Sequence, residues 1–145
     1  MSSKAFFESI GDALVNFLPP SMRGFESYHT SANIKVWYGR QRQEHYEVQR
    51  IASRGVLEIG FHSEHSDRSR NEEVVERLAT VERKWRRALG KEVEIGPFVG
   101  AQSGSWRRVS ELWRAAHWDM DPPTAVEAAE RLATYIKALE PLRNP

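Results

Sequence analysis

The central stretch of the chain decides the fold, and it reads NIKVWY (33–38), HYEVQ (45–49) and VLEIGFH (56–62). Apolar residues occupy alternate positions in each run, and the side chains of a strand point alternately to the two faces of a sheet. The connections between the runs are too short for a parallel return, so they predict antiparallel hairpins and a three-stranded meander over residues 33–63. One register gathers the apolar side chains on a single face: Ile34, Val36, Tyr38, Tyr46, Val48, Leu57, Ile59 and Phe61.

The opposite face of the meander carries polar and titratable side chains together with one large aromatic residue. A tryptophan on such a face often marks a contact surface, because an isolated exposed indole is costly. We therefore predict a surface that binds another protein or a second copy of this chain. The alternative is an ordinary solvated sheet face, which carries cross-strand polar pairs without further function. The predicted binding surface consists of Trp37, His45, Glu47, Glu58 and His62.

The segments around the meander predict helices. Phe6, Ile10 and Leu14 form one stripe of a helix that Pro19 ends, and a connector completes residues 1–32. Asn71 has the character of a helix N-cap, and the apolar spacing after it predicts a helix over 71–89. A capping pattern and apolar spacing predict a last helix over 123–140.

The segment 91–113 predicts a hairpin whose two strands flank a glycine-containing loop. Residues 106–113 also fit a helical stripe, so a helix is the alternative for that half. The whole chain is expected to form one α+β domain over 1–145, in the order α-βββ-α-ββ-α. Its sheet would be mostly antiparallel and five-stranded, with the helices packed on one face.

The composition limits the chemistry that is available to the chain. Its 145 residues include no cysteine, so a metal site would need His, Asp and Glu ligands. The formal charge of +1 supplies no general attraction to nucleic acid. Acidic residues interrupt the apolar residues of the N-terminal segment, and no apolar run is long enough to span a bilayer, so we expect a cytoplasmic protein without membrane contact.

Two further clusters offer alternative sites. Four possible ligands crowd the loop after the third run, which predicts either a solvated loop or a metal site: His62, Glu64, His65 and Asp67. Arginines that could engage phosphates, with tryptophans nearby, support a nucleic-acid-binding accessory domain as an alternative function. That set is Arg83, Arg86, Arg87, Arg107 and Arg108.

The sequence contains neither a phosphate-binding glycine loop nor a nucleophile elbow, so no catalytic residue and no cofactor is predicted. The first hypothesis is a non-enzymatic module that binds a macromolecule or self-associates. The nucleic-acid domain is the second hypothesis. The third is a metal-dependent enzyme or metal protein that uses His45, Glu47 and His62.

A resemblance rests on the succession HYEVQ (45–49), LEIGFHSE (57–64), a helix from Asn71 to Gly90, WRRV (106–109) and LEPL (139–142). This succession resembles a group of uncharacterised bacterial proteins. It is also similar, more distantly, to domains of unknown function appended to restriction-type nucleases. The resemblance covers most of the chain from about residue 33 onward and implies an α+β order with a strand at 106–113. It implies no cleavage activity, since the carboxylates and Glu-x-Lys or Gln-x-Lys pattern of such nucleases are not found.

Overall fold

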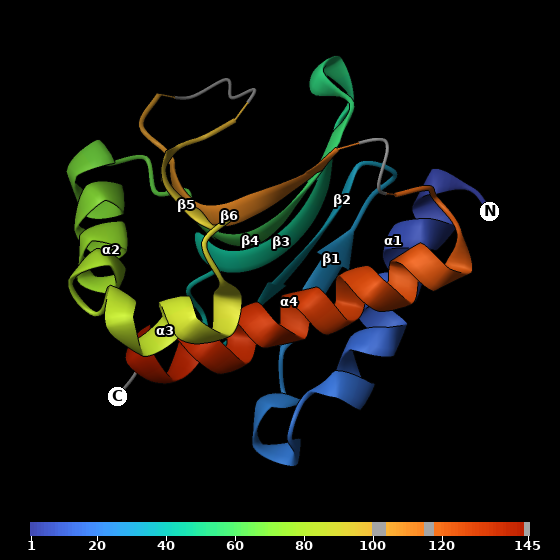
Figure 1. Ribbon diagram of the computed structural model, residues 1–145, viewed down its shortest axis with the longest axis horizontal. Helices are drawn as coiled ribbons and strands as arrows, with labels where there is room; N and C mark the ends of the chain where they lie inside the picture. The colour runs from blue at the N-terminus through green and yellow to red at the C-terminus, as the bar shows by residue number, and fades with distance from the viewer. Residues whose placement is uncertain (100–103, 115–117, 144–145) are drawn as a thin grey trace.

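A six-stranded antiparallel sheet forms the centre of the computed structural model, which describes residues 1–99, 104–114 and 118–143. The strands lie in the order β1-β2-β3-β4-β6-β5, and the long strands bend away from the helices (Figure 1). The strands are β1 (Glu26–His29), β2 (Asn33–Trp37), β3 (Glu44–Ile51), β4 (Val56–Ser63), β5 (Glu94–Pro97) and β6 (Arg107–Arg114).

The helices cover one face of this sheet. Figure 1 shows α1 and α4 side by side beneath the strands, with α3 packed on α4 and α2 beside β6. None of the helices in the described ranges combines the length and the apolar content that crossing a bilayer requires. The α-helices are α1 (Ser3–Leu14), α2 (Arg68–Thr80), α3 (Glu82–Leu89) and α4 (Pro122–Arg143), and 3-10 helices occupy Val15–Phe17, Pro20–Met22 and Ala52–Arg54.

The core lies between the helices and the apolar face of the sheet. The predicted alternation is confirmed, because seven of the eight side chains assigned to that face are buried and only Tyr38 is half-buried. Ala128, Ala129 and Leu132 of α4 bring a largely small-residue surface against the strands, which lets the helix approach closely. The buried sheet side chains are Ile34, Val36, Tyr46, Val48, Leu57, Ile59 and Phe61.

The α+β class, the antiparallel pairing and the helices on one face are confirmed, but the sheet has six strands where the sequence predicted five. The additional strand is β1, which lies in the segment expected to be a connector. The Thr30 hydroxyl accepts hydrogen bonds from the backbone N–H groups of Ala32 and Asn33. This tight turn lets β1 pair with β2, although β1 has no buried face that alternation could reveal.

The helix expected over 71–89 is two helices, α2 and α3, which meet at Val81. The buried Trp85 indole donates to the carbonyl oxygen of Leu78 at 2.8 Å, so this oxygen belongs to the bend and not to a continuous helix. The helix α2 also starts earlier, at Arg68, than the helix predicted from Asn71. Its N-cap is Asp67, whose carboxylate accepts from the N–H of Ser69, whereas Asn71 is buried inside α2.

The predicted pairing within 91–113 is confirmed, because β5 pairs with β6, and the strand interpretation of residues 106–113 is confirmed by β6. Residues 100–103 of the predicted loop lie outside the described residues. The last helix runs over Pro122–Arg143 and so exceeds the predicted 123–140 at both ends. At its start, the Asp121 carboxylate accepts from the N–H of Thr124. Pro141 lies within the helix and does not end it.

Candidate functional site

Four side chains converge on one point of the sheet face that lies opposite the helices. His45 and Glu47 project from β3, His62 projects from β4, and Glu64 follows β4 directly. The strand register places His45 opposite His62 and Glu47 opposite Gly60. One nitrogen or oxygen atom from each of the four side chains lies within 4.8 Å of the other three.

The distances show how tightly these atoms are grouped. Oε1 of Glu47 lies 2.8 Å from Nε2 of His45 and 2.9 Å from Nδ1 of His62. Oε2 of Glu64 lies 3.2 Å from the same two nitrogens. Two imidazole nitrogens therefore share two carboxylate oxygens around a common centre.

The second polar atom of each histidine is held by another group. Nδ1 of His45 donates to the carbonyl oxygen of Arg42 at 2.9 Å. Nε2 of His62 lies 3.0 Å from Oε2 of Glu58. Hydrogen bonds of this kind on the far ring nitrogen orient metal-binding histidines, because they fix both the ring plane and the nitrogen that faces the ion.

The carboxylates are oriented in the same way. The Asn33 amide donates to Oε2 of Glu47 at 2.9 Å, and the Lys35 ammonium donates to Oε1 of Glu64 at 3.1 Å. Each carboxylate thus directs one oxygen toward the common centre and gives the other to a donor from β2. All four converging side chains are held in place before any ligand binds.

Glu58 is the support behind His62. Its two oxygens accept from the Ser110 hydroxyl and from the Gln49 amide, both at 2.5 Å. The Arg108 guanidinium in turn donates to the Ser110 hydroxyl at 2.8 Å. Ser110 lies across from Gly60, where an ideal Cβ would come within 2.4 Å of a backbone oxygen of β6. Only glycine at position 60 allows β4 and β6 to approach this closely.

These side chains are buried, although the sequence suggested a polar face open to contact. His45, Glu47, Glu58 and His62 are each at most 2 % exposed. The Phe98 ring covers His62, with 4.3 Å between the ring centroids, and Trp106 packs on Phe98. Trp37 is half-buried and lies against the guanidinium of Arg42. The predicted binding surface is therefore an interior polar cluster for four of its five residues.

The electrostatics of the cluster favour charged groups despite this burial. Burial alone would raise the pKa of Glu47, but the charge of His62 and hydrogen bonds from both histidines hold that pKa well below its ordinary value. Burial would lower the pKa of His62, but the charges of Glu58 and Glu47 raise it well above its ordinary value. Burial would also raise the pKa of Glu64, but hydrogen bonds from His45 and His62 lower it to about 2.

The loop cluster His62, Glu64, His65 and Asp67 is not brought together as a set. His62 and Glu64 belong to the buried cluster, whereas the His65 imidazole lies 2.7 Å from a carboxylate oxygen of Glu44. The Asp67 carboxylate caps the N-terminus of α2. The alternation continues past the end of β4, and this alone places Glu64 on the face of His62 rather than with the loop.

Three of the five arginines in the predicted nucleic-acid set are engaged by groups of the protein itself. Arg86 binds Glu82 and the carbonyl oxygens of Gly90 and Val93, and Arg107 binds Glu72 and two carbonyl oxygens. Arg108 is only 6 % exposed and supports Ser110. Arg83 and Arg87 are exposed on α3, so they are the two members of the set that lie open to solvent.

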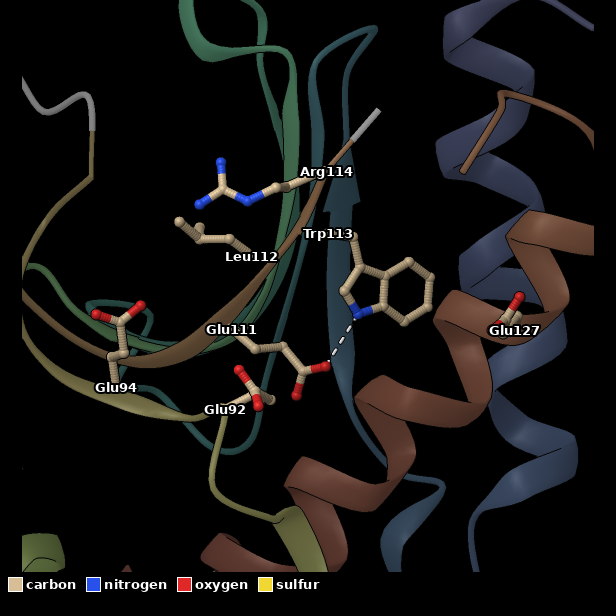
Figure 2. A pocket seen from close by; sticks show the side chains of 7 residues that line it. All are labelled: Glu92, Glu94, Glu111, Leu112, Trp113, Arg114 and Glu127. Carbon is tan, nitrogen blue, oxygen red and sulfur yellow. Dashed lines mark hydrogen bonds between the residues drawn. The ribbon is translucent and has the colours of Figure 1, made fainter. Parts of the chain in front are cut away.

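A separate hollow of about 460 Å³ lies between β6, α4 and the start of β5 (Figure 2). Its one buried acid, Glu111, is already engaged by Trp113, Arg131 and Tyr135. Figure 2 shows Glu127 on the far side of Trp113 from Glu92 and Glu94. These acidic side chains do not converge on one point, so the histidine–glutamate cluster is the better candidate for a site.

Several contributors to the cluster were not among the site residues predicted from the sequence. Lys35 and Asn33 stand two and four positions before Trp37 in the same strand, so alternation places their side chains on the polar face. Ser110 and Arg108 could be assigned only through the pairing of β6 with β4. Comparisons of the chain with protein-family models, with curated proteins and with solved structures gave no match. The resemblance noted from the sequence therefore stays a prediction, and the geometry of the cluster is the basis for any functional inference.

Proposed function

We propose that this protein binds one divalent transition-metal ion between His45, Glu47, His62 and Glu64. The observation that carries the proposal is the convergence of four ligand atoms, one from each side chain. The other nitrogen of each imidazole and the other oxygen of each carboxylate are hydrogen-bonded to surrounding groups. In the absence of an ion the four ligand atoms pair with one another, and their grouping places all four within reach of a single ion. This proposal develops the metal-protein hypothesis made from His45, Glu47 and His62.

The spacing of the four atoms suits a small ion. Metal–ligand distances of ~2.0–2.1 Å in a tetrahedron separate neighbouring ligand atoms by about 3.3–3.4 Å. The nitrogen–oxygen separations in the cluster are 2.8–3.2 Å, so modest outward movements would open the centre to an ion. Mixed imidazole and carboxylate ligands without thiolates suit zinc and other divalent first-row ions, and zinc is the ion used in the test below.

The charges of the cluster also suit a divalent ion. Without an ion, both ring nitrogens of each histidine face acceptor oxygens, so the two rings are held as imidazolium. Their two charges and that of Lys35 offset the carboxylates of Glu47, Glu58 and Glu64. A divalent ion that replaced one proton on each ring would leave the net charge of the cluster unchanged.

The burial of the cluster bears on the other functional hypotheses. His45, Glu47, Glu58 and His62 offer almost no exposed surface to a macromolecule, and Phe98 covers His62. Binding of a small ion needs no such surface. Metal binding is therefore the function that we infer from this face of the sheet.

The test is direct metal analysis of the purified protein and zinc titration after chelation. We expect one ion per chain, and we expect Glu47→Gln and His62→Gln to weaken zinc binding by more than the ~10–100-fold that follows removal of an outer hydrogen-bond partner. His65→Gln is the matched control. It removes an imidazole three positions from His62 that pairs with Glu44 outside the cluster.

Cobalt substitution provides a readout that does not depend on variants. A Co²⁺-loaded parent should show visible absorption bands of a low-coordinate nitrogen and oxygen site. The proposal fails if the chelated parent takes up neither zinc nor cobalt at millimolar concentration. It also fails if Glu47→Gln, shown to be folded by circular dichroism, binds zinc as tightly as His65→Gln does.

A further inference from the structure

A cavity of about 350 Å³ adjoins the cluster on the side of β2 and β3. Glu47 and Glu64 lie in its wall, so the proposed ion would be reached from this cavity. Its volume is at the lower end of the range for small-molecule sites, about 300–1,000 Å³. The Lys35–Glu64 pair separates it from a second hollow of about 190 Å³ beside His45.

The cavity wall has two chemically different parts. Lys35 and Arg50 supply the positive charge of the wall. Among the described residues Arg50 has no ion-pair partner, and Lys35 pairs only with Glu64. Phe98 and Trp106 supply an aromatic part next to the cluster. When Glu47 and Glu64 ligate an ion, the charged groups left facing the cavity are both cationic.

We propose that this cavity binds a small organic carboxylate that has a flat apolar body and becomes an additional ligand of the metal. The inference rests on the proposed metal site. The carboxylate would reach the ion between Glu47 and Glu64 and accept a hydrogen bond from the Lys35 ammonium, while the guanidinium of Arg50 attracts it at the rim. Its apolar body would pack on Phe98 and Trp106.

Benzoate is the probe, and benzylamine is its control with the same ring and the opposite charge. The full chain is loaded with Co²⁺, and each compound is titrated while the visible absorption is followed. We expect benzoate to weaken the cobalt bands in a saturable manner as the coordination number rises, with a dissociation constant of about 1 mM or lower. We expect benzylamine to have no effect.

The variants locate the binding site. Lys35→Met should weaken benzoate binding at least about tenfold, because it removes a charged hydrogen-bond donor. Arg50→Gln should weaken it about two- to fivefold, because Arg50 is exposed and attracts the carboxylate only at the rim. Arg83→Gln removes a positive charge from α3, on the helix side of the sheet, and should bind benzoate like the parent. Arg50 contacts none of the four proposed ligands through its side chain in the described structure, so its variant decides the matter if Lys35→Met disturbs metal loading.

The possible failures are distinguishable. A chain that takes up no cobalt overturns the metal site and this inference with it. A normal cobalt spectrum that benzoate leaves unchanged overturns this inference alone. Equal responses to benzoate and benzylamine, or an Arg50→Gln variant that binds benzoate like Arg83→Gln, would also overturn it.

Discussion

Replacement of Gly60 by alanine should destabilise the protein more than any other glycine substitution within the described strands. An ideal Cβ at this position lies 2.4 Å from the carbonyl oxygen of Val109 and 2.5 Å from Cα of Ser110. Both are backbone atoms, so no side-chain rotation relieves the clash. Carbon contacts are optimal at ~3.5–4.0 Å, so β6 must move away from β4 by about 1 Å.

A shift of this size breaks the neighbouring β4–β6 hydrogen bonds, which are effective only up to donor–acceptor distances of about 3.2 Å. At ~0.5–1.5 kcal/mol for each bond, the loss of two or three costs about 3 kcal/mol. In a domain of this size such a loss lowers the melting temperature by about 6–12 °C. The same movement draws Ser110 away from Glu58, so the support behind His62 should weaken as well.

Urea and thermal unfolding followed by circular dichroism provide the measurement. Gly96→Ala is the matched control, since Gly96 also lies in a strand and a Cβ there meets nothing within 4 Å. We expect the control to change the free energy of unfolding by no more than about 0.5 kcal/mol. If Gly60→Ala unfolds at the same urea concentration as Gly96→Ala, the conclusion that the close approach of β4 and β6 requires glycine at position 60 is wrong.

Three further predictions concern the cluster and the core. Glu58→Gln should weaken zinc binding by about 10–100-fold, since the far nitrogen of His62 loses its carboxylate, and unaltered affinity in a competition titration would contradict this role. In the metal-free protein, the raised pKa of His62 contributes stability that is fully present below the unfolded-state pKa of ~6.5 and is lost as the pH rises through the folded-state pKa. The lowered pKa of Glu64 contributes stability that is present above the unfolded-state pKa of ~4.5 and is lost as the pH falls toward about 2. Melting temperatures of the chelated protein should therefore fall from neutral to alkaline pH while the stabilisation by added zinc grows, and a flat profile for both would count against the cluster. Trp85→Ala should cost about 3–5 kcal/mol in urea unfolding because the indole is fully buried, and a cost below about 1 kcal/mol would show that the site collapses around the cavity.

The sequence by itself determined which side chains share a face of the central strands. Alternation follows from the backbone geometry of each strand, so it does not depend on the neighbours. It correctly separated Val48 and Ile59 of the core from Glu47 and Glu58 of the opposite face. It gave no signal for β1, which is exposed, and the apolar spacing hid the bend at Val81 because the stripe continues through it.

Only the tertiary structure decided that the polar face is an interior cluster and that four of its side chains meet. The pairing of β3 with β4 sets His45 opposite His62, and the return of β6 beside β4 brings Ser110 to Glu58. Phe98, far along the chain, then covers His62. Parity is a property of one strand, whereas register, curvature and cover depend on contacts between segments that are distant in sequence, and no local pattern records them.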